Sequence, residues 1–138
     1  MDTNVLVYAD REELPLHTAA LAELRKLAES PAAWALPVLC LAEFVRVVSH
    51  PRLFDPPTPP GEALDSIAAL LLSPSVRLLL PGPRHWQILD TIIRESRVTG
   101  NLVFDAQIAA LCIENGSRTI LTEDRDFTRF DGLTIRTL

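Results

Sequence analysis

Residues 101–126, NLVFDAQIAALCIENGSRTILTEDRD, contain a helical pattern, a short strand and an acidic turn in one run. Asn101 has a side chain typical of a helix N-cap, and apolar residues recur at helical spacing to about Asn115. Gly116 is typical of a helix end, and residues 119–122 have the composition of a brief buried strand. A helix leading directly into a buried strand is a repeating unit of parallel α/β sheets, so this stretch predicts an α/β fold.

The alternation of helix and strand continues back to the start of the chain. Helices are expected at residues 4–10, 16–29, 39–49, 61–72 and 84–97, and strands at residues 34–37, 76–80 and 133–137, the last at a sheet edge. On the 61–72 helix, Leu64, Ile67, Ala68 and Leu71 share one face. Apolar strands separated by helices predict a mostly parallel sheet covered on both faces, and such sheets bind ligands beyond the carboxyl ends of their strands.

The length of 138 residues fits one compact domain over the whole chain, with the proline-rich stretch from Pro51 to Pro60 as a surface loop. No apolar run approaches the roughly 18 residues of a membrane span. The first four residues, MDTN, lack the basic flank of a signal peptide, so we expect a cytoplasmic protein. Cys40 and Cys112 form no CxxC spacing and are expected to be buried thiols.

Net charge by itself speaks against nucleic acid as a partner, because the formal charge is −5. Of the 13 basic residues, however, all but one are arginine, the side chain best suited to bidentate phosphate contacts. The arginines near expected element ends that could line an RNA groove are Arg46, Arg84, Arg97 and Arg125, together with Arg52 and Arg129. The same residues could equally be ordinary surface charges.

Two carboxylates stand inside helical apolar patterns, where burial is costly. Asp105 is in the first turn of its expected helix, at the edge of the apolar stripe, and Glu43 is in an almost wholly apolar helix. An ionised carboxylate in such a place needs a partner or a metal ion. A polar residue near a helix end would also explain Asp105, and a surface pair with Arg46 at i+3 would also explain Glu43.

Two further acids are expected at the carboxyl ends of strands. Asp124 follows the apolar run 119–122, and Asp2 stands just before the first expected helix. A solvated loop would also explain Asp124, with Asp126 and Glu123 as competitors for its place or Asp126 as the cap of the turn that follows. A plain helix N-cap would also explain Asp2.

Together, the four acids would come from separate elements to one sheet edge. Like charges about 4 Å apart repel by about 4 kcal/mol per pair at an effective dielectric near 20, so such a cluster must bind protons or a cation. Oxygen ligands without histidine or cysteine select a hard ion, magnesium or manganese. The chemistry that follows is metal-assisted hydrolysis of a phosphodiester bond.

The sequence resembles the PIN-domain ribonucleases and, within them, the VapC toxins of type II toxin–antitoxin pairs. The resemblance is carried by four ordered segments: DTNVL at residues 2–6, LAEF at 41–44, NLVFDA at 101–106 and LTEDRDF at 121–127. Each segment is a weak signal, but their order and spacing run the length of the domain. The resemblance implies a three-layer α/β/α sandwich with a mostly parallel central sheet.

The resemblance also implies roles for individual residues. The acidic quartet of the family, which binds Mg²⁺ or Mn²⁺, matches Asp2, Glu43, Asp105 and Asp124, with Asp2, Asp105 and Asp124 as the metal ligands. Thr122 matches a hydroxyl residue that supports the network of the site, with Asn4 and Asp126 as further supporting residues. Members of the family hydrolyse RNA, typically dimerise, and are silenced by a cognate antitoxin that often places an arginine in the acidic pocket.

One departure concerns the start of the chain. Family members carry several apolar residues before the first aspartate, whereas here only Met1 precedes Asp2. Either the first half of that strand is missing because the start is misplaced or trimmed, or Asp2 lies at a frayed end. The alternative function is a non-catalytic module of the same fold whose acidic pocket captures an arginine-bearing partner. A phosphatase with a nucleophilic aspartate is a poor alternative, because its second acid would fall at Asn4.

Overall fold

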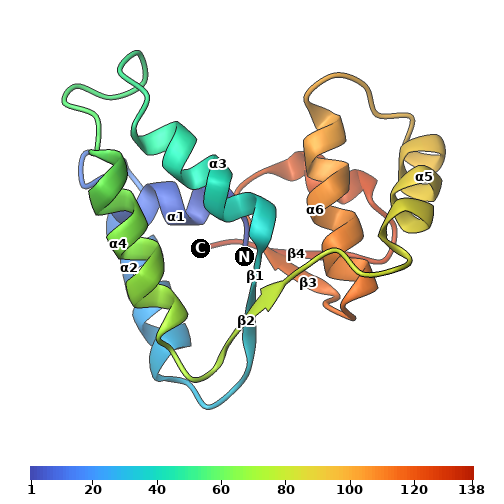
Figure 1. Cartoon of the computed structure of the whole chain (residues 1–138), viewed down its shortest axis with the longest axis horizontal. Helices are drawn as coiled ribbons and strands as arrows, with labels where there is room; N and C mark the ends of the chain where they lie inside the picture. The colour runs from blue at the N-terminus through green and yellow to red at the C-terminus, as the bar shows by residue number, and fades with distance from the viewer.

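Four short strands run parallel in two pairs, and helices flank them on both sides (Figure 1). The computed structural model describes all of residues 1–138. Its elements, in chain order, are α1 (Thr3–Asp10), α2 (His17–Glu29), β1 (Trp34–Pro37), α3 (Val38–Val48), α4 (Pro60–Leu71), β2 (Val76–Leu79), α5 (His85–Ser96), α6 (Leu102–Glu114), β3 (Thr119–Leu121), the 3-10 helix η1 (Arg125–Arg129) and β4 (Thr134–Arg136). The α/β class and the parallel strands predicted from the sequence are confirmed.

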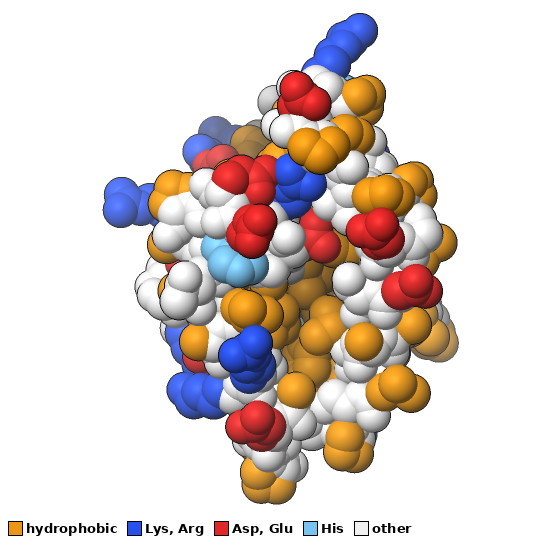
Figure 2. All heavy atoms as spheres, turned by 90° about the vertical axis from the view of Figure 1, so that its left-hand side faces the viewer, with side chains coloured by type: hydrophobic (Ala, Val, Ile, Leu, Met, Phe, Trp, Pro, Cys, Tyr) orange, Lys and Arg blue, Asp and Glu red, His pale blue; other side chains and the backbone are white.

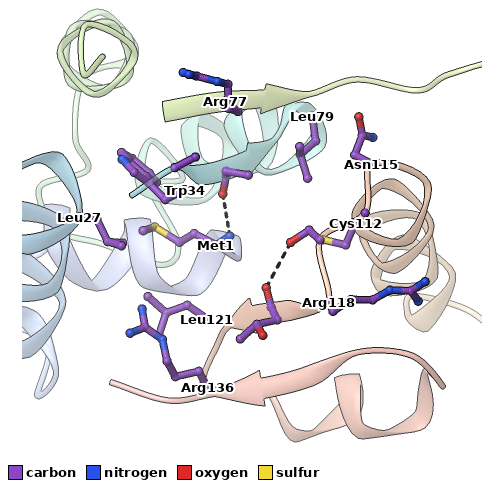
Figure 3. A pocket seen from close by; sticks show the side chains of 15 residues that line it. Met1, Leu27, Trp34, Arg77, Leu79, Cys112, Asn115, Arg118, Leu121 and Arg136 are labelled. Atoms are coloured by element: carbon purple, nitrogen blue, oxygen red, sulfur yellow. Dashed lines mark hydrogen bonds between the residues drawn. The ribbon is translucent and has the colours of Figure 1, made fainter. Parts of the chain in front are cut away.

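The start of the chain connects the two pairs of strands. β1 pairs with β2, and β3 with β4. Between the pairs, the Met1 amino group donates to the Ala35 carbonyl at 2.9 Å, and the Asp2 N–H donates to the Leu121 carbonyl at 3.0 Å. A cavity of about 590 Å³ lies beside Met1, between β1 and β3 (Figure 3). The backbone of Met1 and Asp2 thus bridges the two pairs and fixes Asp2 beside the end of β3.

Element ends follow local chemistry. α6 ends at Glu114, and the chain turns away at Gly116, whose φ of +75° suits glycine, while the Ser117 N–H donates to the Cys112 carbonyl at 2.8 Å. α3 ends before His50-Pro51, because the residue before a proline avoids helical backbone angles. α4 begins at Pro60, since proline fits the first turn of a helix.

The structure corrects four details of the sequence predictions. Asn101 stands at the N-cap position of α6 but makes no side-chain cap bond, because its own backbone is already helical (φ −64°, ψ −26°). Pro60 belongs to α4, not to the preceding loop. The N-terminus is not frayed, since Met1 and Asp2 are 8% and 5% exposed. On α4 the buried residues are Ala63 and Ile67, while Leu64, Ala68 and Leu71 are exposed, because α4 turns a different face to the core than its apolar spacing suggests.

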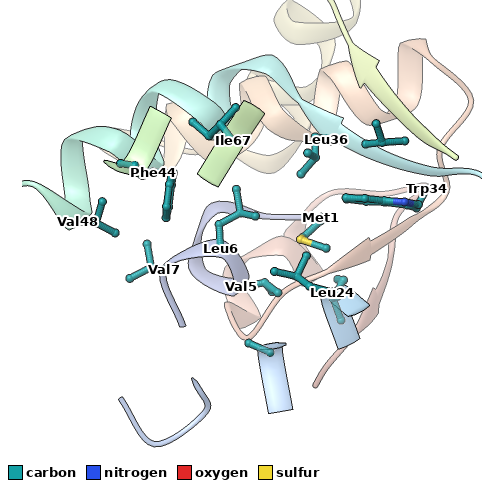
Figure 4. Packing of buried hydrophobic residues seen from close by; sticks show 14 residues of the cluster. Met1, Val5, Leu6, Val7, Leu24, Trp34, Leu36, Phe44, Val48 and Ile67 are labelled. Atoms are coloured by element: carbon teal, nitrogen blue, oxygen red, sulfur yellow. The ribbon is translucent and has the colours of Figure 1, made fainter. Parts of the chain in front are cut away.

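Two hydrophobic clusters lie on the two sides of the strands, which gives the three-layer arrangement. The first cluster packs α1, α2, α3 and α4 around residues such as Met1, Leu36 and Phe44 (Figure 4). The second packs α5, α6 and η1 around Phe127 and Phe130, whose rings meet edge to face at 5.7 Å. Because Met1 belongs to the first cluster, apolar packing holds the start of the chain in place.

Both cysteines are buried and unpaired, as the sequence predicts. Burial raises the pKa of the Cys40 thiol to about 12, so this side chain behaves as a small apolar residue. None of the helices has the length and apolar character that crossing a membrane requires.

Candidate functional site

All four acids predicted for the site line one pocket of about 260 Å³. Asp2 precedes α1, Glu43 lies on α3, Asp105 in the first turn of α6, and Asp124 just after β3. The other lining residues are Thr3, Asn4, Val7, Tyr8 and Val47. The pocket thus lies beyond the carboxyl end of β3, beside the helix that follows β1, which is the edge where parallel sheets present their ligands.

Asp2 is the most buried of the four acids, and hydrogen bonds use both of its carboxylate oxygens. Its Oδ1 accepts the Thr3 N–H at 2.7 Å, so Asp2 is the N-cap of α1. Its Oδ2 accepts the Thr122 hydroxyl at 2.6 Å and the Asn4 amide at 2.8 Å. Burial raises the pKa of Asp2 above its ordinary value, and the bonds from Thr122 and Thr3 oppose that rise.

Thr122 and Asn4 both hold the Asp2 carboxylate by hydrogen bonds. The fully buried Thr122 hydroxyl donates to Asp2 and accepts from the Asn4 amide at 2.8 Å and from the Asp124 N–H at 3.0 Å. The Oδ1 atom of the Asn4 side chain accepts the Glu123 N–H at 3.3 Å. These contacts tie the start of the chain to the segment after β3, so the position of Asp2 is coupled to that of Asp124.

Glu43 is held from two sides. Its Oε2 accepts the Thr3 hydroxyl at 2.9 Å, and its Oε1 pairs with Arg46 Nη2 at 3.2 Å. The Glu43–Arg46 surface pair, which the sequence offered as an alternative to a site role, is therefore present, and Glu43 lines the pocket as well. The sequence reasoning missed Thr3 as a partner of Glu43, and no local pattern could reveal a bond between residues 40 positions apart.

Asp105 differs from the other three acids because its carboxylate makes no hydrogen bond or ion pair within the protein. It is half-buried and faces the other carboxylates of the pocket. Burial, followed by repulsion from Asp124, Asp2 and Glu43, raises the pKa of Asp105 to about 6. Because this carboxylate has no partner and lies beside three other acids, binding a cation or a proton would relieve the repulsion and stabilise it.

Asp124 and the two acids beside it separate into different roles. Asp124 accepts the Asp126 N–H at 2.8 Å, so it caps η1 while it lines the pocket. Asp126 does not line the pocket, and its carboxylate pairs with Arg129 at 3.0 Å. Glu123 accepts the Leu138 N–H at 2.7 Å. Of the three acids in the turn, only Asp124 lies with Asp2, Glu43 and Asp105.

The donor set suits a hard divalent cation, because it consists of carboxylate oxygens with hydroxyl and amide oxygens beside them. In the arrangement described, no three His, Cys, Asp or Glu side chains converge closely enough to coordinate one ion. Coordination therefore requires the carboxylates to turn toward one another. Asp105 is the freest to do so, because it has no other partner to give up.

Among the six arginines considered for RNA contact, Arg46, Arg84, Arg97 and Arg125 are exposed but do not form one cluster. Arg46 pairs with Glu43 at the rim of the pocket, and Arg125 directly follows Asp124. Arg84 and Arg97 are the N-cap and C-cap of α5, at opposite ends of that helix. None of the four lines the pocket.

Comparison with known proteins gives consistent results. The family model described as "PIN domain" matches residues 1–133. Ribonuclease VapC43 of Mycobacterium tuberculosis is 40% identical over 130 residues, which cover 94% of this chain and 88% of that protein. Ribonuclease VapC31 of the same organism is 32% identical over 130 residues, covering 94% and 91%. A crystal structure of VapBC2 from Rickettsia felis, bound to a DNA fragment from its promoter, matches with a TM-score of 0.70 and 18% identity over 99% of this chain and 96% of the other, which shows a shared fold.

Proposed function

The chain belongs to the PIN domain family and, within it, to the VapC ribonucleases, and from this membership we propose that it is an endoribonuclease that acts as the toxin of a toxin–antitoxin pair. The observation that carries the proposal is the meeting of four carboxylates from separate elements in one pocket, with the Asp105 carboxylate left without a partner. Such an arrangement disfavours the folded state, and it is intelligible if the acids serve a reaction.

Magnesium is the cofactor we propose, with manganese as a substitute. Asp2, Asp105 and Asp124 would hold it, since their oxygens line the same pocket. When bound, the ion supplies charge neutralisation at the scissile phosphate and lowers the pKa of a bound water. Thr122 and Asn4 act by fixing the Asp2 carboxylate through the bonds at 2.6 and 2.8 Å.

Glu43 has a different role in the proposal, as the carboxylate that orients the attacking water and accepts its proton. The Thr3 hydroxyl holds Glu43 Oε2, so that oxygen is aimed by a residue of α1 that is itself buried. Glu43 Oε1 contacts the exposed Arg46, which can release it toward solvent or substrate.

RNA would reach the pocket past exposed arginines. Arg46 and Arg125 lie directly beside pocket residues and are the best placed to contact phosphates on either side of the cleaved bond. Arg84 and Arg97, at the two ends of α5, would contact RNA farther from the pocket. Phosphate contacts of this kind make binding weaken with salt, whereas a flat salt response would contradict them.

A protein partner, the cognate antitoxin, is part of the same proposal. Leu64 and Leu71 of α4 and Leu72 directly after it are 56%, 38% and 84% exposed, which is unusual for neighbouring leucines. Seen from the side where α2 and α4 lie, hydrophobic side chains floor a furrow that runs down this face (Figure 2). An amphipathic segment of the antitoxin would cover this apolar surface, and we also expect the chain to form a homodimer.

The test of the proposed function is Asp105→Asn, assayed for cleavage of single-stranded RNA with Mg²⁺. Loss of at least a hundredfold in rate is expected, because the substitution removes one charged ligand without changing its size. The matched control is Asp90→Asn, the same change at an acid that pairs with Arg94 on the exposed face of α5, and it should keep the full rate. Cleavage by Asp105→Asn at the unmutated rate would contradict the site.

The alternative, capture of an arginine-bearing partner without hydrolysis, is favoured by one observation. As the side chains stand, no three acids converge on one point, while Glu43 already contacts an arginine. Under this alternative, the unmutated protein would bind its partner and leave RNA intact at every Mg²⁺ and Mn²⁺ concentration. The same cleavage assay therefore separates the two functions.

A further inference from the structure

The pocket has an apolar end as well as an acidic end, and we propose that the apolar end binds a nucleobase, with Tyr8 as its stacking platform. The inference rests on the proposed function, because it names which part of an RNA substrate the pocket holds. The residues that form this end are Val7 and Tyr8 of α1 and Val47 of α3. None of them carries charge, and Tyr8 is the only aromatic residue lining the pocket.

The acidic and apolar ends of the pocket lie one helical turn apart on α1 and on α3, the two helices that contribute most of its lining. On α1, Asn4 and Tyr8 are four residues apart, and on α3, Glu43 and Val47 are four residues apart. Residues at i and i+4 share a face and are displaced by about 6 Å along the axis. The apolar side chains therefore lie about 6 Å from the carboxylates. This separation is similar to the distance between a phosphate of RNA and the base of the same nucleotide.

Tyr8 has the properties of a rigid platform. It is half-buried and packs against the first hydrophobic cluster, so one side of the residue is supported by the core. Its backbone carbonyl accepts from His17 Nδ1 at 3.0 Å, which ties this turn of α1 to the start of α2. The Tyr8 hydroxyl makes no hydrogen bond within the protein, whereas the hydroxyls of the buried Thr3 and Thr122 are both bonded to carboxylates of the site. The side chain therefore keeps both ring surface and a polar group for a ligand.

Electrostatics explains why such a platform is needed. The carboxylates repel the phosphates of RNA, and the chain as a whole carries a net charge of −5. Stacking of a base on an aromatic ring is independent of charge and gives affinity where charge gives none. The cavity of about 260 Å³ is below the roughly 300–1,000 Å³ of sites for drug-sized ligands, and bases that stack on aromatic side chains in this way are unpaired ones. The substrate implied is single-stranded RNA.

The first experiment compares Tyr8→Leu with Tyr8→Phe in cleavage of a labelled single-stranded oligoribonucleotide. Tyr8→Leu keeps the apolar bulk but removes the ring, and it should raise KM about tenfold with kcat changed less than threefold. Tyr8→Phe keeps the ring and should change KM less than twofold. The matched control is Trp86→Leu on α5, an aromatic residue 71% exposed and outside the pocket, which should leave KM unchanged. An unchanged KM in Tyr8→Leu would overturn the proposal.

The first arm of the second experiment uses the unmutated protein, so this arm does not depend on whether a variant folds. A series of oligoribonucleotides, each with one abasic position near the cleaved bond, is assayed for KM. One position should raise KM about tenfold, and in Tyr8→Leu that same abasic substrate should cause no further rise, because the contact is already lost. If no abasic position raises KM, the proposed stacking on Tyr8 is wrong. It is also wrong if the abasic position raises KM by the same factor in Tyr8→Leu as in the unmutated protein, because the two changes would then act independently.

Binding measured without cleavage keeps the failure of this inference distinct from failure of the proposed function. Fluorescence anisotropy of the labelled oligoribonucleotide is compared between Asp105→Asn and Asp105→Asn/Tyr8→Leu. About tenfold weaker binding by the double variant supports the platform even if cleavage is never observed. If Tyr8→Leu leaves RNA binding unchanged and weakens binding of the antitoxin, Tyr8 belongs to the protein interface and the proposal is wrong.

Discussion

Asp2 and Asp105 line the same pocket, yet the protein holds them in opposite ways. Asp2 is 5% exposed and accepts three hydrogen bonds, from the Thr3 N–H, the Asn4 amide and the Thr122 hydroxyl. Asp105 is half-buried and accepts none, so repulsion from its neighbours adds to burial in raising its pKa to about 6. The hydrogen bonds of Asp2 therefore stabilise the fold, whereas the unpaired charge of Asp105 destabilises it.

This difference indicates that, within one site, Asp2 contributes to stability as well as activity, whereas Asp105 contributes to activity at the expense of stability. Removing Asp2 removes a helix cap and the acceptor for the buried Thr122 and the partly buried Asn4, so its loss should affect folding as well as chemistry. Removing the charge of Asp105 relieves repulsion, so its loss should impair chemistry while stabilising the fold. The four predictions below test this division, in order of decreasing effect on the free energy of unfolding.

Asp2→Ala should lower the free energy of unfolding by about 3 kcal/mol, because three donors lose their acceptor in a buried place. Urea unfolding followed by circular dichroism measures the change, and Asp65→Ala, at an exposed position of α4, is the control expected within about 0.5 kcal/mol of the unmutated protein. A loss as small as that of the control would show that the bonds to Asp2 do not stabilise the fold.

Thr122→Val should cost about 2 kcal/mol, because the shape is kept while the donor to Asp2 and the acceptor for Asn4 are removed. Cleavage should fall as well, since Asp2 loses its shortest bond. Thr119→Val makes the same change at an exposed position of β3 and should alter neither quantity. If Thr122→Val were as stable as the unmutated protein, the buried network would not be what fixes Asp2.

Asp105→Asn should raise the free energy of unfolding on the order of 1 kcal/mol at pH 8 in EDTA, after allowance for solvent screening of this half-buried group. The folded-state pKa of about 6 lies above the ordinary 3.8, so the carboxyl contributes stability that is fully present below pH 3.8 and is lost as the pH rises through 6. The gain should therefore vanish at pH 3.5. A difference between variant and unmutated protein that stays constant from pH 3.5 to 8 would contradict this.

Asp126→Asn should have the smallest effect, within about 0.5 kcal/mol, because its partner Arg129 is exposed and the Asp126 contact with Asp124 uses the backbone N–H. RNA cleavage should stay within twofold of the unmutated rate. A loss comparable with that of Asp105→Asn would place Asp126 in the reaction and would move the boundary of the site.

The predictions from sequence succeeded where the signal was local. Gly116 marks the end of α6 because a left-handed backbone is cheap only for glycine, and the apolar runs around it identify α6 and β3. The acids of the pocket were recognisable because each interrupts or closes an apolar element, where a charge is costly. On α4 the apolar spacing was right only for Ile67, since Leu64 and Leu71 are exposed and the core also took Ala63.

Other features could not be foreseen, because they depend on contacts between distant parts of the chain. The bond between Thr3 and Glu43 spans 40 positions, and that between Thr122 and Asp2 spans 120. The burial of Met1 and Asp2 likewise depends on β1 and β3, which accept their N–H groups from either side. Terminal residues have no local pattern that distinguishes such a docked end from a frayed one.

The kinds of elements, their order and the oxygen chemistry of the site can be read from short segments, because helix and strand periods and side-chain donors are local properties. The hydrogen bonds that saturate Asp2, and the lack of any at Asp105, arise only in the folded chain. The tertiary structure also set Tyr8 beside the acids. These outcomes follow from which surfaces pack together, and packing is decided by the whole chain at once.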